Sequence, residues 1–268
     1  MPKHLLKNIE PVKSVLREKK ISLFLDYDGT ITPIVGRPED AHPSYPVREV
    51  LKETLRLYPT AVISGRKLSD LIRSVGIKEL VYAGNHGLEI SARQFTMYFD
   101  IGKDIRKEFE RLRKPLKELT QRFRGVLFED KGLTFTVHYR LLNSRDVIFL
   151  SEQFNRIIDE PVKSGLVRFG ESKKAYDIFP NVRWDKGKAV EWILDRTKFK
   201  GTFPFYFGDD VTDIDGFRAM RGKGFSVFVG GSSPDTDFYV YGPDEVKAFL
   251  RFLCRHPLPS GELFSDIF

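Results

Sequence analysis

The stretch LFLDYDGT, residues 23–30, places two aspartates directly after an apolar run. The run 21–25 is mostly apolar and does not alternate, which predicts a strand buried on both faces, as in a parallel α/β sheet. Such sheets bind ligands at the carboxyl ends of their strands. Asp26 and Asp28 point to the same side and repel each other unless a cation or proton lies between them. We therefore expect a metal site; the alternative is a turn at Asp28-Gly29, with Asp26 as a helix cap.

The composition is typical of a folded protein with one large domain or two modest ones. The chain has 268 residues, of which 41% are hydrophobic and 30% are charged. No apolar segment approaches the ~20 residues of a membrane span, and residues 1–20 lack the apolar core of a signal peptide. We therefore expect a cytoplasmic protein that does not insert into membranes.

The net charge and the cysteine count limit the classes of function that the protein can have. A net charge of +7 would suit nucleic-acid binding, but basic and acidic residues are interleaved and no arginine-rich run is present. We expect no nucleic-acid partner, and a phosphorylated small molecule suits this charge as well. The single cysteine, Cys254, excludes an internal disulfide, and its place in VKAFLRFLCRH predicts a packed helix residue rather than a catalytic thiol.

Two parts of the chain alternate strand and helix patterns, which predicts a parallel sheet. They are the segment 21–84 and the segment after Trp184. The expected strands are 21–27, 60–64, 80–84, 204–210 and 224–230, and the expected helices are 46–57, 68–75, 186–197, 214–222 and 243–255.

The pattern between these parts changes to hairpins. Paired strands are expected at 87–91 with 95–99, at 125–130 with 132–140 and at 166–170 with 175–180, with helices near 103–123 and 144–158. We therefore expect an α+β domain at 85–180, inserted into a core made of 1–84 and 181–268. The tail 256–268 is expected to be irregular.

Other predicted strands also end in polar groups. AVISGR ends a strand with Ser64 and Gly65, which would offer a hydroxyl and free backbone N–H groups to a phosphate; a helix cap is the alternative. Lys186 begins a helix, where a cation opposes the helix dipole, although an exposed lysine is the simpler interpretation. YFGDDVTD ends a strand with an acidic cluster that could also be a solvated loop. Four such ends on one sheet favour a shared site.

Taken in order, four motifs resemble those of the haloacid dehalogenase superfamily of phosphatases: D-x-D-G-T, hydrophobic-S-G-R, K-G and G-D-D-x-x-D. The resemblance implies a Rossmann-like core with a cap inserted between the second and third motifs, where the pattern changes. Nearly the whole chain resembles trehalose-6-phosphate phosphatases, through LDYDGTITPIV, GNHGLE, FEDKGLTFTVHYR, WDKGKAVEWIL and YFGDDVTDIDGF. FEDKGLTFTVHYR matters most because it lies in the cap, which contacts the leaving group.

The resemblance implies hydrolysis of trehalose 6-phosphate, the final step of trehalose biosynthesis, through an aspartyl-phosphate. Asp26 would be the nucleophile and Asp28 the acid and base, with their proximity dividing the two pKa values. Ser64 and Lys186 would stabilise the phosphate oxygens, with Lys188 as the alternative lysine. Mg²⁺ would be the cofactor. The residues assigned to the metal site are Asp26, Asp28 (through its backbone carbonyl), Asp209, Asp210 and Asp213.

The resemblance also implies a sugar-binding face. In the hairpin 125–140, polar side chains alternate with Phe135, Val137 and Tyr139, so one face would be polar and roof the site. The residues assigned to the substrate are Gly65, Arg66, Asn85, His86, Glu129, Lys131, His138, Arg140 and Asp177. Asp177 stands where the family usually has glutamate, and Ile214 where its last motif is usually acidic.

Two alternatives stay open. Another sugar-phosphate phosphatase, for sucrose phosphate or a glycosyl-3-phosphoglycerate, would share the core motifs, but an extra carboxylate on the substrate would favour a more basic cap. The second alternative is a non-catalytic binding or regulatory module on the same fold. Such a module would not need the catalytic residues, yet every residue that the chemistry needs is present. A small-molecule sugar phosphate is the expected partner, with trehalose-6-phosphate synthase as a further candidate and a monomer otherwise.

Overall fold

The computed structural model describes residues 1–35, 40–93, 95–172 and 174–256. The chain forms two compact units, the first made of Met1–Tyr98 with Trp184–Phe268 and the second of Phe99–Arg183. The expected irregular tail, apart from His256, lies outside the described residues. Among those described, no helix is both long and apolar enough to cross a membrane.

The first unit is built on one sheet, with nine strands among the described residues in the order β1-β13-β12-β11-β2-β3-β4-β5-β6. All neighbours from β1 to β4 pair in parallel, whereas β4–β5 and β5–β6 are antiparallel. The strands are β1 (Lys3–His4), β2 (Ile21–Asp26), β3 (Thr60–Ile63), β4 (Val81–Gly84), β5 (Glu89–Ala92), β6 (Phe95–Tyr98), β11 (Phe203–Gly208), β12 (Phe225–Val229) and β13 (Phe238–Val240).

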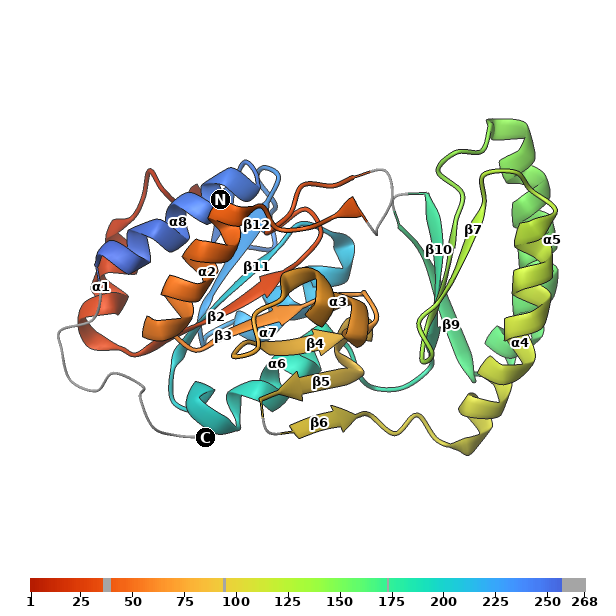
Figure 1. Cartoon of the computed structure of the whole chain (residues 1–268), viewed down its shortest axis with the longest axis horizontal. Coiled ribbons are helices and arrows are strands. Elements are labelled where there is room, and N and C mark those ends of the chain that lie inside the picture. Colours follow the sequence, from red (N-terminus) through yellow and green to blue (C-terminus); the bar gives the residue numbers. More distant parts are fainter. Residues whose placement is uncertain (36–39, 94, 173, 257–268) are drawn as a thin grey trace. The chain divides into compact units, whose positions relative to one another are not determined.

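Helices cover both faces of this sheet (Figure 1). On one face, Leu23 and Leu25 of β2 pack with α1 (Glu10–Glu18), α2 (Tyr45–Leu57), α3 (Leu68–Val75) and α8 (Pro243–Arg255). On the other, Phe24 packs with α6 (Lys186–Leu194) and α7 (Ile214–Met220). Alternate side chains of β2 are thus buried on opposite faces, which explains its unbroken apolar sequence. The mixed α/β fold with a mostly parallel sheet is confirmed.

One predicted hairpin belongs to a different part of the molecule than expected. The sequence placed residues 87–99 in the inserted domain, but β5 pairs with β4 and extends the core sheet. Without β5, the backbone groups at this edge of β4 would be unpaired, and Ile90 of β5 is fully buried in the core cluster of α6 and α7. The first unit therefore continues to Tyr98, beyond the expected boundary at residue 84.

The second unit is an antiparallel sheet of order β7-β8-β10-β9 packed on two helices (Figure 1). Its elements are α4 (Lys103–Gln121), β7 (Leu127–Asp130), β8 (Phe135–His138), α5 (Ser144–Lys163), β9 (Val167–Ser172) and β10 (Ala175–Pro180). Phe135 and Val137 of β8 are fully buried with α4 and α5. Because side chains alternate along a strand, Thr136 and His138 lie on the other face, as the sequence predicts.

The short turns near the strand ends include three 3₁₀ turns, η2 (Asn85–Gly87), η3 (Thr197–Phe199) and η4 (Val211–Asp213). Cys254 lies in α8, partly buried against the core cluster, so the prediction of a packed helix residue is confirmed.

Candidate active site

Three strand ends bring the first polar groups together. β2 pairs in parallel with β3 on one side and with β11 on the other, and Asp26 is level with Ile63. Asp26 ends β2, Ser64 follows β3, and Asp209 follows β11. Parallel neighbours end at the same edge of a sheet, so these residues share one site, as the sequence predicts.

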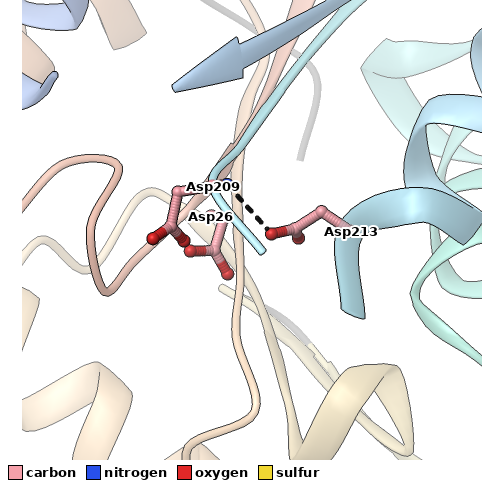
Figure 2. Close-up of side chains that lie close together, drawn as sticks. All are labelled: Asp26, Asp209 and Asp213. Atoms are coloured by element: carbon pink, nitrogen blue, oxygen red, sulfur yellow. Dashed lines mark hydrogen bonds between the residues drawn. The ribbon is translucent and has the colours of Figure 1, made fainter. Parts of the chain in front are cut away.

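The acidic cluster lies at this edge. Asp26, Asp209 and Asp213 each offer one carboxylate oxygen, all within 4.8 Å of one another. Figure 2 shows the carboxylates of Asp26 and Asp209 next to each other, with Asp213 bound to the backbone of Asp209. Asp26 is 5% exposed and Asp213 is fully buried. Close carboxylates repel unless a cation offsets their charge, and oxygen ligands suit Mg²⁺, so a cluster that contains Asp26 and Asp209 fits the expected ion.

Lys186 contacts two of these carboxylates. Its Nζ lies 2.7 Å from Oδ1 of Asp26 and 2.6 Å from Oδ1 of Asp213, and the side chain is 3% exposed. Burial alone would lower the pKa of Lys186, but the charges of Asp213 and Asp26 outweigh it and raise the pKa above its usual range. Lys186 therefore stays protonated, and its interpretation as an exposed lysine was wrong.

Burial raises the pKa of Asp26 well above its usual range, and the charge of Asp213 raises it further, while Lys186 opposes the shift. A divalent cation would favour the ionised form. Lys188, the alternative lysine, instead pairs with Glu191 on the exposed side of α6, at 2.8 Å. The side chain of Asp185 caps this helix by accepting the N–H of Lys188.

Asp28 lies outside the acidic cluster and is bound by arginine. Its carboxylate accepts hydrogen bonds from Nε and Nη2 of Arg66, at 2.7 and 2.6 Å. The guanidinium also lies over the ring of Tyr27, with its central carbon 4.8 Å from the ring centroid. Arg66, expected to bind substrate, thus orients Asp28 in this structure.

The turn after Asp28 depends on glycine. Gly29 has a φ of +87°, and a Cβ there would lie 2.1 Å from Oδ2 of Asp209. Any other residue would be strained and would push the Asp209 carboxylate away. The glycine of the DGT motif therefore lets the turn after β2 and the segment of Asp209 approach closely.

The turn after β3 is more fully hydrogen-bonded than the sequence suggests. Ser64 is 2% exposed, its N–H is donated to the carbonyl of Ala83, and its Oγ accepts the N–H of Arg66 at 3.2 Å. The N–H of Ser64, which was expected to be free for a phosphate, is therefore occupied, and so is the N–H of Arg66. His86 lies against this turn, because a Cβ on Gly65 would be 2.5 Å from its Nε2.

The segment Asn85–Gly87 has a left-handed backbone, with φ of 49° at Asn85 and 57° at His86. Such values are uncommon outside glycine and cost free energy. The Asn85 side chain donates to Oε2 of Glu89 at 2.6 Å, and the same oxygen accepts the N–H of Leu68. Glu89, which the sequence did not single out, stabilises the turn that carries His86.

Asp213 accepts more hydrogen bonds than the sequence indicates. Its Oδ2 accepts the N–H groups of Asp209 and Asp210, and its Oδ1 also accepts the hydroxyl of Tyr206. The Asp210 carboxylate caps η4 by accepting the N–H of Val211 at 2.7 Å and is not part of the acidic cluster. Tyr206 was not predicted as a site residue because an aromatic residue in an apolar strand indicates a core position.

The second unit carries its own polar cluster. Thr136 pairs with Glu129 on one neighbouring strand and with Asp177 on the other, so the three lie in a row across the sheet. Nζ of Lys131 donates to Oγ1 of Thr136 at 2.9 Å, and that hydroxyl donates to Asp177 at 2.6 Å. Nε2 of His138 lies 2.8 Å from Glu129. Aspartate at position 177 therefore reaches the cluster despite its shorter side chain.

Arg140, the remaining expected sugar-binding residue, lies on an exposed turn after β8. Glu129, Lys131, His138 and Asp177, which the resemblance assigned to the sugar, thus lie together in one cluster of this unit.

Comparison with known proteins settles the family. The model of the trehalose-phosphatase family matches residues 24–248, most of the chain. The chain belongs to the trehalose-phosphatase family. Two relatives of this family illustrate the similarity. "Probable trehalose-phosphate phosphatase 4" of Oryza sativa subsp. japonica is 32% identical over 255 residues, which cover 91% of this chain and 69% of the relative. Trehalose 6-phosphate phosphatase RA3 of Zea mays is 30% identical over 277 residues, covering 95% and 76%.

Solved structures of other proteins have the same fold as this chain. The C-terminal domain of the C. albicans trehalose-6-phosphate phosphatase superposes with a TM-score of 0.81 at 22% identity, covering 95% of this chain and 98% of that one. A haloacid dehalogenase-like hydrolase from B. subtilis gives a TM-score of 0.58 at 14% identity, covering 87% and 99%. The protein is therefore a phosphatase with a haloacid dehalogenase-like fold, and the recognition made from its motifs is confirmed.

Proposed function

We propose that this chain hydrolyses trehalose 6-phosphate to trehalose and phosphate, with Asp26 as the nucleophile. The observation that carries the proposal is the Asp26 carboxylate, buried at the end of β2, beside Asp209 and 2.7 Å from the ammonium of Lys186. A carboxylate in this setting is desolvated and oriented, as nucleophilic catalysis requires. The relatives of the chain are named for the same substrate.

The reaction would proceed in two displacements. An Oδ oxygen of Asp26 attacks phosphorus in line, and the bond from phosphorus to the sugar 6-oxygen breaks. Asp28 donates a proton to the leaving oxygen, because an alkoxide is a poor leaving group. A water molecule then attacks the phosphoaspartyl group, Asp28 accepts its proton, and the bond between phosphorus and Asp26 breaks to release phosphate.

Asp26 and Asp209 would hold Mg²⁺ together with the backbone carbonyl of Asp28. The ion would neutralise charge on the phosphate when bound. Lys186 adds a fixed positive charge beside the nucleophile, and Ser64 with Gly65 would bind phosphate oxygens. One well-placed donor typically lowers the barrier by about 3 kcal/mol.

Arg66 has two tasks in this proposal. It binds both oxygens of Asp28 in the structure, so proton donation requires it to release at least one of them. A substrate phosphate would offer the guanidinium another acceptor of suitable geometry. We therefore assign Arg66 to substrate binding and to the orientation of Asp28. We also assign His86, which lies beside the same turn, to substrate binding.

The second unit would bind the sugar. Its cluster combines carboxylates, an ammonium, a hydroxyl and an imidazole, so it offers both donors and acceptors to sugar hydroxyls. The residues that we assign to the sugar are Glu129, Lys131, His138, Arg140 and Asp177. A phosphoglycerate substrate would favour a more basic set.

Phosphate release from a panel of sugar phosphates tests the proposal. The panel contains trehalose 6-phosphate, sucrose 6-phosphate, glucose 6-phosphate and glucosyl-3-phosphoglycerate, each assayed with Mg²⁺ and with EDTA. We expect the highest kcat/KM for trehalose 6-phosphate and no release with EDTA. A higher value for another member would replace the substrate, and turnover in EDTA would overturn the role of the metal. That the protein works as a cytoplasmic monomer, or with trehalose-6-phosphate synthase, stays a prediction.

A further inference from the structure

A tyrosine hydroxyl is buried beneath the acidic cluster. Tyr206 lies in the middle of β11, is fully buried, and donates its hydroxyl to Oδ1 of Asp213 at 2.7 Å. Its neighbours Phe205 and Phe207 pack on the opposite face of the sheet. The tyrosine ring packs edge-on against Phe217 of α7, with centroids 5.6 Å apart. The hydroxyl is thus held in one position against Asp213.

Asp213, its acceptor, connects the parts of the site. One oxygen accepts Nζ of Lys186 and the hydroxyl of Tyr206, and the other accepts the backbone N–H groups of Asp209 and Asp210. A carboxylate offers about four acceptor sites, so these four donors use all of them. Asp213 therefore holds neighbouring groups in place through its hydrogen bonds. Of the three clustered carboxylates, those of Asp26 and Asp209 are then the ones available to a metal.

Two glycines make room for this arrangement. A Cβ on Gly216 would lie 2.3 Å from Cζ of Tyr206, and a Cβ on Gly208 would lie 2.4 Å from Cγ of Asp213. Neither glycine has a left-handed backbone, so conformation does not explain them. Gly216 is inside α7, where glycine costs about 1 kcal/mol relative to alanine. Close packing against the tyrosine ring and the carboxylate accounts for both residues.

We propose that Tyr206 is a positioning residue that fixes Asp213, and through it Lys186 and the backbone of Asp209. Without its hydroxyl, Asp213 can rotate between its remaining donors. The ammonium of Lys186 then moves relative to Asp26, and the Asp209 carboxylate loses its fixed place in the metal site. This inference rests on the proposed function, which gives the site its catalytic role. The hydrogen bond from Tyr206 to Asp213 does not depend on the identity of the sugar.

Tyr206→Phe tests the inference because it removes one oxygen atom and keeps the ring. One hydrogen bond to a charged group corresponds to about tenfold in an equilibrium constant. We expect the dissociation constant for Mn²⁺, measured by electron paramagnetic resonance on the protein without substrate, to rise about tenfold. With p-nitrophenyl phosphate at saturating Mg²⁺, kcat should fall by a similar factor while KM changes by less than about twofold.

Tyr82→Phe is the matched control. Tyr82 is also buried in the first unit, and its hydroxyl donates at 2.6 Å to the carbonyl of Ile77, far in sequence from the acidic cluster. Both variants should lower the unfolding temperature, because each loses a buried hydrogen bond, but Tyr82→Phe should leave Mn²⁺ affinity and kcat unchanged. The inference is overturned if Tyr206→Phe keeps both quantities at the wild-type level, or if Tyr82→Phe lowers both equally. The Mn²⁺ measurement stays decisive even if wild-type protein does not hydrolyse trehalose 6-phosphate, so the two proposals can fail separately.

Discussion

Arg66 binds both carboxylate oxygens of Asp28, at 2.7 and 2.6 Å, and joins the ends of the neighbouring strands β2 and β3. The arginine side chain is 10% exposed and that of Asp28 is 42% exposed, so the pair lies at the boundary between protein and solvent. The ring of Tyr27 supports the guanidinium from one side. The proposed acid and base is therefore oriented by a residue of the turn that follows β3.

We predict that Arg66→Lys lowers kcat/KM for trehalose 6-phosphate about tenfold, because an ammonium cannot replace the two parallel hydrogen bonds of a guanidinium. Steady-state kinetics with Mg²⁺ measure the effect. Arg73→Lys is the control, since Arg73 forms a surface pair with Asp70, and such pairs contribute little. Wild-type kinetics for Arg66→Lys would show that Asp28 does not need this orientation.

A second prediction concerns the nucleophile. Asp26→Asn should abolish phosphate release, because an amide does not attack phosphorus, and residual activity within about tenfold of wild type would exclude Asp26 as the nucleophile. The metal-free variant should also unfold at a higher temperature than wild type at neutral pH. Burial and the charge of Asp213 raise the pKa of Asp26, so its ionised form costs folding free energy.

This stability effect depends on pH. A group with a raised pKa in the folded state stabilises below its unfolded pKa and loses that contribution as pH rises. The advantage of Asp26→Asn should therefore appear at neutral pH and shrink in acid, where Asp26 is protonated in both states. Scanning calorimetry in EDTA from acidic to neutral pH measures it. An advantage that grows toward acid would contradict the assignment.

A third prediction separates the two lysines of α6. Lys186→Met leaves three clustered carboxylates without their buried cation, and removing one partner of a buried ion pair typically costs about 3 kcal/mol or more. We expect a large loss of unfolding free energy in urea together with loss of activity. Lys188→Met, two residues away and exposed, should change neither. Equal stability losses in both variants would mean that helix propensity, rather than the acidic cluster, explains the effect.

The sequence predicted the position of a side chain correctly where that position follows from strand direction. Asp26, Ser64 and Asp209 meet because parallel strands end at one edge, and that rule needs no tertiary contact. The alternation in β8 likewise separated core from polar residues correctly.

Other features depended on contacts between segments far apart in the sequence. The hairpin of β5 and β6 joined the core because the edge of β4 was available, which local periodicity does not reveal. The pairing of Arg66 with Asp28 depends on side-chain geometry across two strands, and the N–H of Ser64 is occupied by the carbonyl of Ala83 in the neighbouring strand β4. The polar contact of Tyr206 could not be predicted from the sequence. A tyrosine in an apolar strand looks like a core residue until the acceptor of its hydroxyl is known.

A fourth prediction concerns the single cysteine. Burial raises the pKa of the Cys254 thiol, and its sulfur lies 3.4 Å from Oγ1 of Thr54. Little thiolate is therefore present at neutral pH, so Cys254 should react slowly with a maleimide in the folded protein and rapidly in guanidinium chloride. Mass spectrometry over time measures the rates. Cys254→Ser should retain full phosphatase activity, and fast labelling with loss of activity would reveal a functional thiol.

The last prediction separates sugar recognition from phosphate chemistry. Glu129 lies on the polar face of the second unit, where it contacts His138 at 2.8 Å and is 27% exposed. Glu129→Gln keeps its shape but replaces one acceptor oxygen by a donor, so sugar hydroxyls that donate to it lose their partner. We expect kcat/KM for trehalose 6-phosphate to fall about tenfold, while p-nitrophenyl phosphate, which has no sugar, stays near the wild-type value. The matched control is Asp130→Asn, because the adjacent Asp130 pairs with Arg113 of α4. Equal losses on both substrates for Glu129→Gln would assign Glu129 to folding or to the phosphate rather than to the sugar.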